Sequence, residues 1–202
     1  MKQLSPKQKE IRDRESALLD SAQDMLLSRG YLGLTMDRLA DAIGVSKGTV
    51  NQHFSNKEAV LAAIAVRSAD TRAALFERAG AFRGRSRERM AAVGTAAELF
   101  FALYPHHEQA ERTVRASTIA DKISPKRARN MESCTFRCCG VATGIVRDAI
   151  AAGDLTLRDG QTVEQLCVGL WNLYTGAFLM RELENFIDEP VVNDPMPTLM
   201  AN

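Results

Sequence analysis

Residues 35–57 read TMDRLADAIGVSKGTVNQHFSNK, and this stretch decides the fold of the N-terminal part of the chain. It holds two short amphipathic segments, MDRLADAI and KGTVNQHF, separated by a Gly-Val-Ser turn. Thr35 and Ser46 stand directly before the two segments, where a hydroxyl can cap a helix by accepting a hydrogen bond from its first turn. The pattern predicts two short helices joined by a tight turn, which must cross steeply to bury their apolar faces.

Three residues meet the packing needs of such a pair. Ala40 is small, as the first helix requires where the second crosses it. Gly44, four residues later, tolerates the backbone angles of a tight turn. Val50, six residues after the glycine, is a branched apolar anchor on the second helix. Leu39, Ile43 and Val45 fill the space between, and the whole set predicts a helix-turn-helix.

The exposed face of the second helix carries the chemistry. The major groove of B-DNA admits one α-helix and presents a distinct pattern of donors and acceptors for each base pair. Lys47 can reach guanine O6 and N7, and Gln52 or Asn51 can pair with adenine through two hydrogen bonds. These three side chains are the candidate base readers.

The remaining candidates contact or approach the DNA backbone. Thr49 and His53 suit phosphates, and Gly48 lacks a side chain that would hold the helix off the duplex. Lys57 stands at the start of the next helix, where backbone N–H groups also point outward. The predicted DNA-binding set is Thr35, Ser46, Lys47, Gly48, Thr49, Asn51, Gln52, His53 and Lys57.

Charge alone does not show whether the polar face of the second helix binds DNA or only contacts water. The chain carries a net charge of +1, which argues against a general polyanion binder. Residues 1–57 hold nine Lys and Arg against seven Asp and Glu.

The stretch LTMDRLADAIGVSKGTVNQHFSNKEAVL, residues 34–61, resembles the DNA-binding signature of TetR/AcrR-type bacterial transcriptional regulators. The preceding segment is similar to the first helix of that family, and the resemblance covers about residues 11–64. That segment carries Ala17, Leu18, Leu19, Ala22 and Leu26, followed by Gly30 and Tyr31. The resemblance implies a three-helix DNA-binding domain, a partner that is double-stranded DNA, and most often a repressor.

Asn51 departs from the family pattern. Members usually carry a tyrosine at this position, and that residue commonly touches the DNA backbone. An amide offers less reach and no ring, so Asn51 is also a candidate for reading a base.

The whole chain reads as helix. It has 202 residues, of which 46% are hydrophobic and 25% charged, as in ordinary globular proteins. No apolar run approaches the roughly 18–20 residues of a membrane span, and the N-terminus lacks the apolar core of a signal peptide. We therefore expect a cytoplasmic protein with reduced cysteines and no membrane partner.

Apolar periodicity and turn residues predict the helices and their ends. Gly30 suits the end of the first helix, while Ser55 or Asn56 suits the cap of the fourth, Ser55 with Glu58 forming a capping-box pattern. The predicted long helices cover 7–28, 57–81, 87–103, 126–152 and 161–186. The predicted division is a DNA-binding domain at 1–57, a larger helical domain at 58–187 and a flexible tail at 188–202.

For the C-terminal domain, the resemblance implies binding of a small-molecule effector and formation of a homodimer. The last two helices are rich in small residues, which permit close helix contacts across a dimer but equally an ordinary intrachain core. A two-fold dimer would place two recognition helices about 34–36 Å or a multiple apart, so the operator should be a pseudo-palindrome.

Bulky side chains are the candidate effector pocket, although a stripe such as Trp171, Tyr174 and Phe178 is more often core. The predicted pocket residues are Phe76, Phe100, Tyr104, Phe136, Trp171, Tyr174 and Phe178. They favour an apolar or aromatic effector. An anionic effector stays open because of Arg112, Arg115 and Arg137.

Three other groups of residues can be interpreted either as structural or as functional. Cys134, Cys138, Cys139 and Cys167 are small buried hydrophobes or, alternatively, sensors of oxidants or electrophiles. His106, His107 and Glu111 fit an exposed cluster better than a metal site. Arg83, Arg85, Arg87 and Arg89 fit a solvated bend better than a nucleic-acid contact.

No enzyme motif is present, so we expect neither catalytic residues nor a metal or cofactor. The main rival to an effector-binding regulator is a DNA-binding regulator whose C-terminal part binds a protein. An enclosed cavity there would favour the effector, whereas a flat apolar patch would favour the protein partner.

Overall fold

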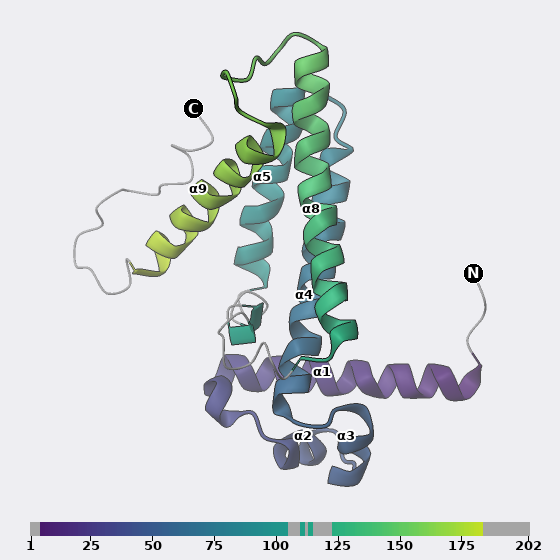
Figure 1. Ribbon diagram of the computed structural model, residues 1–202. Helices are drawn as coiled ribbons and strands as arrows, with labels where there is room; N and C mark the ends of the chain where they lie inside the picture. Colours follow the sequence, from purple (N-terminus) through teal and green to yellow (C-terminus); the bar gives the residue numbers. More distant parts are fainter. Residues whose placement is uncertain (1–4, 105–109, 112, 115–122, 184–202) are drawn as a thin grey trace. The chain divides into compact units, whose positions relative to one another are not determined.

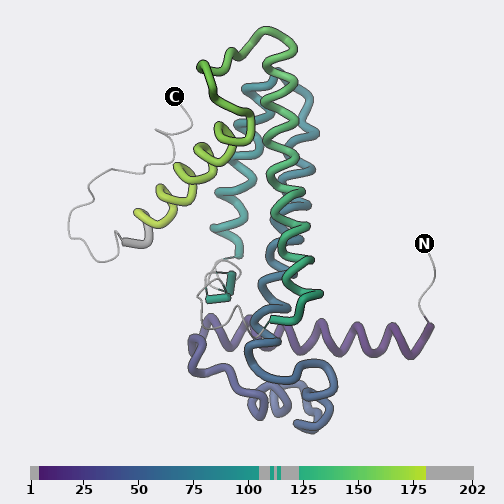
Figure 2. Tube along the Cα trace, viewed as in Figure 1, coloured from purple at the N-terminus to yellow at the C-terminus, as the bar shows by residue number. Residues whose placement is uncertain are grey.

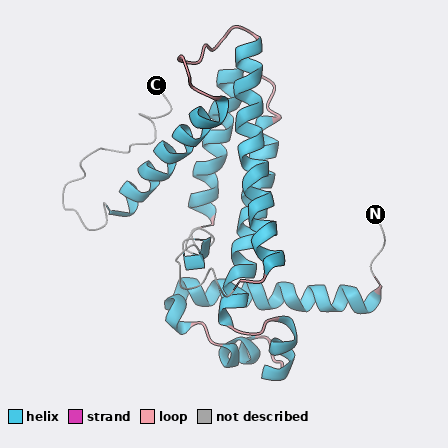
Figure 3. Ribbon diagram, in the orientation of Figure 1, coloured by secondary structure: helices cyan, strands magenta, loops and turns pink. Residues whose placement is uncertain are grey.

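The computed structural model of the chain describes residues 5–104, 110, 111, 113, 114 and 123–183. In this described part the regular secondary structure is entirely helical, which confirms the predicted all-α fold (Figures 1 and 3). The labelled helices are α1 (Pro6–Gly33), α2 (Met36–Ala42), α3 (Lys47–His53), α4 (Lys57–Gly80), α5 (Ser86–Leu103), α8 (Pro125–Ala151) and α9 (Val163–Leu183). None of these described helices combines the length and apolarity needed to cross a bilayer.

Two compact units divide the chain: Met1–Ala73 with Phe100–Thr135, and Ala74–Leu99 with Phe136–Asn202. The division passes through α4, α5 and α8, so each of these helices contributes residues to both units (Figure 2). The domain boundary after residue 57 stays a prediction. The expected flexible tail at 188–202 lies outside the described residues.

The first unit has one apolar core, built by helices that each bury one face. In α1, Leu18, Ala22 and Leu26 recur every four residues on one side and are at most 2% exposed. The same cluster takes in Leu39, Val50, Phe54, Val60, Leu61 and Ile64 from the stretch between α2 and α4. Ala110 and Val114 also belong to it, so a segment far along the chain helps to hold the N-terminal helices.

Helix α1 begins at Pro6, one residue before its predicted range of 7–28, and Gly30 interrupts it near its end. Ser5 and Gln8 form a capping box, in which the Gln8 N–H donates to Ser5 Oγ at 3.3 Å and the Ser5 N–H donates to Gln8 Oε1 at 2.9 Å. Gly30 has φ 64° and ψ −175°, which lie outside the helical region and interrupt the helix; helical backbone then resumes as far as Gly33. The structure therefore confirms a stop at Gly30, followed by a short helical piece that the pattern does not predict.

Helix α4 is capped by Asn56, whose Oδ1 accepts a hydrogen bond from the Ala59 N–H at 2.8 Å. This confirms one of the two predicted caps. Glu58, the acidic residue of the alternative capping box, accepts a hydrogen bond from the Tyr31 hydroxyl at 3.2 Å.

The second unit joins its helices by buried apolar side chains and by ion pairs at their edges. Arg89 Nη1 lies 2.6 Å from Asp148 Oδ2, and Arg147 Nη2 lies 2.6 Å from Glu164 Oε1. Arg83, Arg85 and Arg87 are exposed, as a solvated bend requires. Arg89 departs from that prediction, because it also donates from Nε to the Gly80 carbonyl at 3.1 Å and so fastens the bend to the fold.

A buried ion pair ties the 110–111 segment to α4 in the first unit. Arg72 Nη1 lies 2.7 Å from both carboxylate oxygens of Glu111, and the Ser68 hydroxyl donates to Oε1 at 2.6 Å. The Arg72 and Glu111 side chains are only 5% and 4% exposed, so the prediction of an exposed cluster is wrong for Glu111. Breaking such a pair strands a charge away from water, which costs far more than breaking an exposed pair.

We therefore expect Glu111→Ala to lower the free energy of unfolding by about 3–5 kcal/mol. Urea unfolding followed by circular dichroism measures this change. The matched control is Glu10→Ala, which removes the exposed Arg14 pair at 2.6 Å and should cost less than about 1 kcal/mol. Similar losses for the two variants would contradict the account of the buried pair.

Candidate nucleic-acid interface

The turn between α2 and α3 is fixed by one left-handed residue. Gly44 has φ 67°, a conformation that side chains disfavour, and no atom lies within 4 Å of where its Cβ would stand. Its N–H donates to the Asp41 carbonyl at 3.2 Å, and the Val45 N–H donates to the Ala40 carbonyl at 3.0 Å. Glycine is needed here for its backbone angles, as the sequence predicts, and not for lack of space.

The two short helices begin at the predicted caps. Thr35 Oγ1 accepts from the Arg38 N–H at 3.3 Å, and Ser46 Oγ accepts from the Thr49 N–H at 3.1 Å. Each cap satisfies one backbone donor that the first turn leaves without a helical partner. The side-chain oxygens of Thr35 and Ser46 therefore fix where α2 and α3 start.

Burial fixes which face of α3 points outward. Val50 and Phe54 lie four residues apart on one side, and both are at most 1% exposed. Leu39 and Ala40 of α2 are also buried, at 0% and 4% exposed, as the predicted helix crossing requires. Figure 1 shows α2 and α3 next to each other, with α3 running into the turn before α4.

The opposite face of α3 is polar and open. Lys47, Gly48, Asn51 and Gln52 are exposed, while Thr49 and His53 are half-buried at its edges. The Thr49 and Ser46 hydroxyl oxygens lie 2.9 Å apart, so one of them donates to the other. The structure thus brings the candidate base readers together on one accessible surface.

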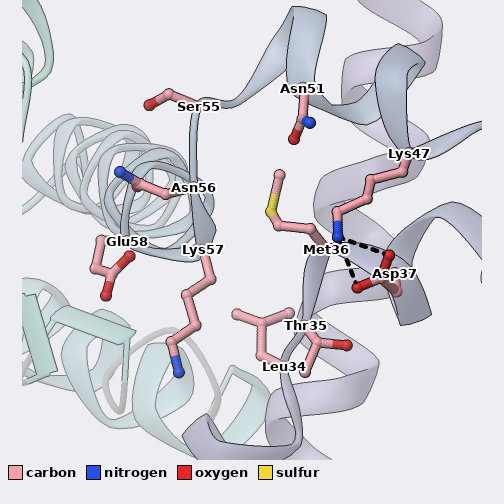
Figure 4. A pocket seen from close by; sticks show the side chains of 10 residues that line it. All are labelled: Leu34, Thr35, Met36, Asp37, Lys47, Asn51, Ser55, Asn56, Lys57 and Glu58. Atoms are coloured by element: carbon pink, nitrogen blue, oxygen red, sulfur yellow. Dashed lines mark hydrogen bonds and ion pairs between the residues drawn. The ribbon is translucent and has the colours of Figure 1, made fainter.

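Lys47 has an intrachain partner that the sequence analysis did not identify. Its Nζ lies 2.9 Å from Asp37 Oδ1 and 3.0 Å from Oδ2, across the gap between α3 and α2 (Figure 4). The two side chains are 56% and 67% exposed. Because the partners are ten residues apart on different helices, only the tertiary crossing of α2 and α3 places them in contact.

Lys57 is held at the start of α4 by an aromatic ring. Its Nζ lies 4.1 Å from the centre of the Tyr31 ring, a cation–π contact. Partial burial raises the pKa of Tyr31, and the negative Glu58 carboxylate, which accepts a hydrogen bond from the Tyr31 hydroxyl, raises that pKa further. Tyr31 therefore stays neutral and presents its ring to the lysine.

These side chains border a shallow hollow with a volume of about 400 Å³. Figure 4 shows Lys47 and Lys57 on two sides of it, with Asn51 reaching in from α3. Its lining residues are Leu34, Thr35, Met36, Asp37, Lys47, Asn51, Ser55, Asn56, Lys57 and Glu58. A hollow bordered by two ammonium groups and by amide and hydroxyl side chains suits the phosphates and base edges of a polynucleotide.

The predicted pocket aromatics are divided between the two units. Phe100 and Tyr104 belong to the first unit, with ring centres 5.7 Å apart. Phe76 and Trp171 belong to the second, with ring centres 6.3 Å apart. Phe136 is 68% exposed.

Tyr174 and Arg137 have hydrogen-bond partners within the second unit. Tyr174 donates its hydroxyl to the Gly94 carbonyl at 2.5 Å, and Phe178 is half-buried in the same unit. Arg137 binds Glu77 through Nε at 2.7 Å, and this hydrogen bond holds the pKa of Glu77 below its ordinary value. Arg112, Arg115, His106 and His107 lie outside the described residues.

The four cysteines differ in access. Cys134, Cys138 and Cys167 are buried and Cys139 is exposed; these four, all within the described residues, form no disulfide. Burial raises the pKa of the Cys167 thiol, and Cys139 and Glu164 raise it further, so little reactive thiolate forms there. No group of three or more His, Cys, Asp or Glu among the described residues is arranged to hold a metal ion.

Comparison with known proteins points in one direction. Residues 18–64 match the family described as "Bacterial regulatory proteins, tetR family". The transcriptional activator FasR of Mycolicibacterium smegmatis is 33% identical over 102 residues, which are 50% of this chain and 45% of that protein. The repressor Rv1474c of Mycobacterium tuberculosis is 36% identical over 67 residues, or 33% of this chain and 36% of that protein. The chain spans about half or less of the length of these curated relatives.

Solved structures match over nearly the whole chain. A protein of unknown function from Rhodococcus sp. RHA1 is 22% identical, with a TM-score of 0.73 and coverage of 93% of this chain and 90% of that one. The fatty acid degradation regulator FadR of Bacillus halodurans is 12% identical, with a TM-score of 0.72 and coverage of 99% and 95%. At these identities the likeness shows the fold.

The cysteine geometry gives a direct expectation about reactivity. Near neutral pH, iodoacetamide should alkylate Cys139 first, because Cys167 is buried with a raised pKa and Cys134 and Cys138 are also buried. Mass spectrometry of the native protein after timed labelling measures the order. In denaturant all four should react at similar rates. Labelling of Cys167 in the native protein as fast as that of Cys139 would overturn this interpretation.

Proposed function

We propose that this chain is a transcriptional regulator of the TetR type that binds double-stranded DNA of a specific sequence, since its residues 18–64 match that family. The observation that carries the proposal is the exposed polar face of α3, which Val50 and Phe54 hold outward beside a hollow flanked by two lysines. A helix presented in this way fits the major groove. In this proposal the protein needs no metal or cofactor and is not an enzyme.

In the proposed complex, α3 reads base edges. Lys47 donates to guanine O6 and N7, while Gln52 pairs with adenine through its amide. Asn51 is exposed on the same face and reaches into the hollow, as Figure 4 shows. Its amide can therefore read a base at a position where family members usually have a tyrosine.

The surrounding groups hold the phosphates. Lys57 stands where α4 begins, and its charge adds to the partial positive charge of that helix end. Of the Ser46 and Thr49 hydroxyls, one hydrogen is used in their mutual 2.9 Å contact and the other remains for a phosphate oxygen. Thr35 and His53 complete the set at the ends of α2 and α3.

We further propose that two copies associate through α8 and α9. Val168, Leu170 and Leu173 of α9 are 54%, 41% and 58% exposed, an apolar surface that isolated chains seldom leave in water. Nothing lies within 4 Å of where a Cβ would stand at Gly140, Gly144, Gly169 or Gly176, so a second helix can approach closely there. Two-fold symmetry would then require a pseudo-palindromic operator.

We propose repression released by a small-molecule effector, with the tentative pocket residues as its candidates. An effector can release DNA only by binding better to a conformation whose recognition helices are misplaced. Helix α4 carries Lys57 at one end and contributes residues to both units, which makes it the candidate lever. Two of the relatives are named repressors and FasR an activator.

The alternatives have weaker support. Oxidant sensing would depend mainly on Cys139, because the other three thiols are buried. A protein partner in place of an effector would use the exposed apolar residues of α9 that we assign to the dimer.

Two variants separate base reading from backbone attraction. Gln52→Ala should weaken binding to a selected duplex by about 1–3 kcal/mol and leave binding to a scrambled duplex unchanged. Lys57→Ala should weaken both about equally and reduce the salt dependence. Fluorescence anisotropy with both duplexes at several salt concentrations measures this. Equal losses on the two duplexes for Gln52→Ala would remove Gln52 from base reading.

Gly48 separates the needs of the fold from those of DNA binding. A Cβ at this position would contact only Ser46 Oγ, at an ordinary 3.6 Å. Gly48→Ala should therefore keep or raise stability, by up to about 1 kcal/mol. The added methyl should weaken binding to the selected duplex by about 1–3 kcal/mol, the scale of one good base contact. Thermal melting and anisotropy measure the two effects; unchanged DNA affinity would show that α3 does not approach the duplex at Gly48.

A further inference from the structure

We propose that Asp37 is a specificity-determining residue of the DNA interface, which positions Lys47 for base reading and cancels its attraction to non-cognate phosphates. The inference rests on the proposed DNA-binding function. It concerns an acidic side chain that lines the same hollow as Lys47, Asn51 and Lys57. A carboxylate on a surface meant for a polyanion needs a reason, because it repels the ligand.

The geometry joins Asp37 to one partner. Both of its carboxylate oxygens lie within 3.0 Å of Lys47 Nζ, and Figure 4 shows the two side chains meeting at the edge of the hollow. Asp37 is in the first turn of α2, and Lys47 is the first residue of α3. Because both helix starts are fixed by caps, the carboxylate and the ammonium are anchored on two rigid elements.

The pair is not there mainly for stability. Its side chains are 56% and 67% exposed, and ion pairs so accessible to water contribute little to folding. Exposure instead leaves the ammonium accessible to a ligand. An ammonium has three donors, so Lys47 can keep its contact with Asp37 and still donate to a guanine edge.

Asp37 would affect the binding of cognate and of random DNA differently. On a cognate site the carboxylate holds Nζ beside the base edge, so less conformational freedom is lost when the base contact forms. On random DNA there is no matching base, and binding depends on attraction to phosphates. There the negative charge of Asp37 offsets that of Lys47. Asp37 therefore lowers non-specific binding and spares the cognate complex.

The test compares Asp37→Asn with the unaltered protein on two probes, a duplex selected from a randomised pool and poly(dI-dC). The variant should bind poly(dI-dC) more tightly and the selected duplex no more tightly, so that discrimination falls. The gain on poly(dI-dC) should grow about threefold from roughly 200 mM to roughly 50 mM salt, as expected for one additional phosphate contact.

Two further variants isolate the cause. Asp24→Asn makes the same chemical and charge change at an exposed position of α1 outside the hollow, and it should alter neither affinity. In a Lys47→Met background, Asp37→Asn should change discrimination by less than about twofold, because contacting residues couple in a double-mutant cycle. Thermal melting checks that every variant folds.

Several results would overturn the inference. Discrimination equal to that of the unaltered protein, or a full effect of Asp37→Asn without Lys47, would show that Asp37 does not act through Lys47. If Asp37→Asn lowers affinity for the selected duplex and leaves affinity for poly(dI-dC) unchanged, Asp37 is a direct base reader. If the unaltered protein prefers no sequence, the proposed function itself fails and this inference fails with it; the other results leave that function standing.

Discussion

The burial of Val50 and Phe54 is the constraint on which the rest of the site depends. The two side chains lie one helical turn apart, and both are almost fully removed from water. Turning α3 about its axis would expose them and lose several kcal/mol of hydrophobic burial, at roughly 1.5–3 kcal/mol for each large side chain. That cost holds Gly48, Asn51 and Gln52 on the opposite, exposed face.

The core that anchors α3 is assembled from distant parts of the chain. Ala110 and Val114 pack in the same cluster as Val50, and Ile123 and Met131 pack against it. The buried contact between Arg72 and Glu111 fastens the 110–111 segment to α4. A displacement of that segment would therefore disturb the core beneath α3. This gives the proposed effector response a physical route within the first unit.

Local sequence rules predicted most of the helix-turn-helix formed by α2 and α3. The hydroxyl caps at Thr35 and Ser46 and the left-handed turn at Gly44 depend on residues within a few positions of one another, so they are legible in the sequence. Gly30 follows the same kind of local rule, since its positive φ interrupts α1 where the sequence predicts a stop.

The contacts that sequence reasoning missed join residues from different elements. Asp37 meets Lys47 only because α2 and α3 cross, and Glu111 reaches Arg72 across 39 positions of sequence. Arg89 belongs to a run of arginines that suggests a solvated bend, yet Asp148, 59 positions away, holds it. The surroundings of the aromatic residues were hard to predict for the same reason. A helical stripe shows that residues share one face of a helix, but not which other element covers that face.

The central claim is that the outward face of α3 recognises a DNA sequence. The most direct measurement incubates the full chain with a pool of randomised duplexes and sequences the bound fraction after several rounds. The account predicts enrichment of one short motif in two inverted copies, with enrichment abolished when Lys47, Asn51 and Gln52 are all replaced by alanine. A bound fraction as random as the starting pool, or enrichment that survives the triple replacement, would contradict it.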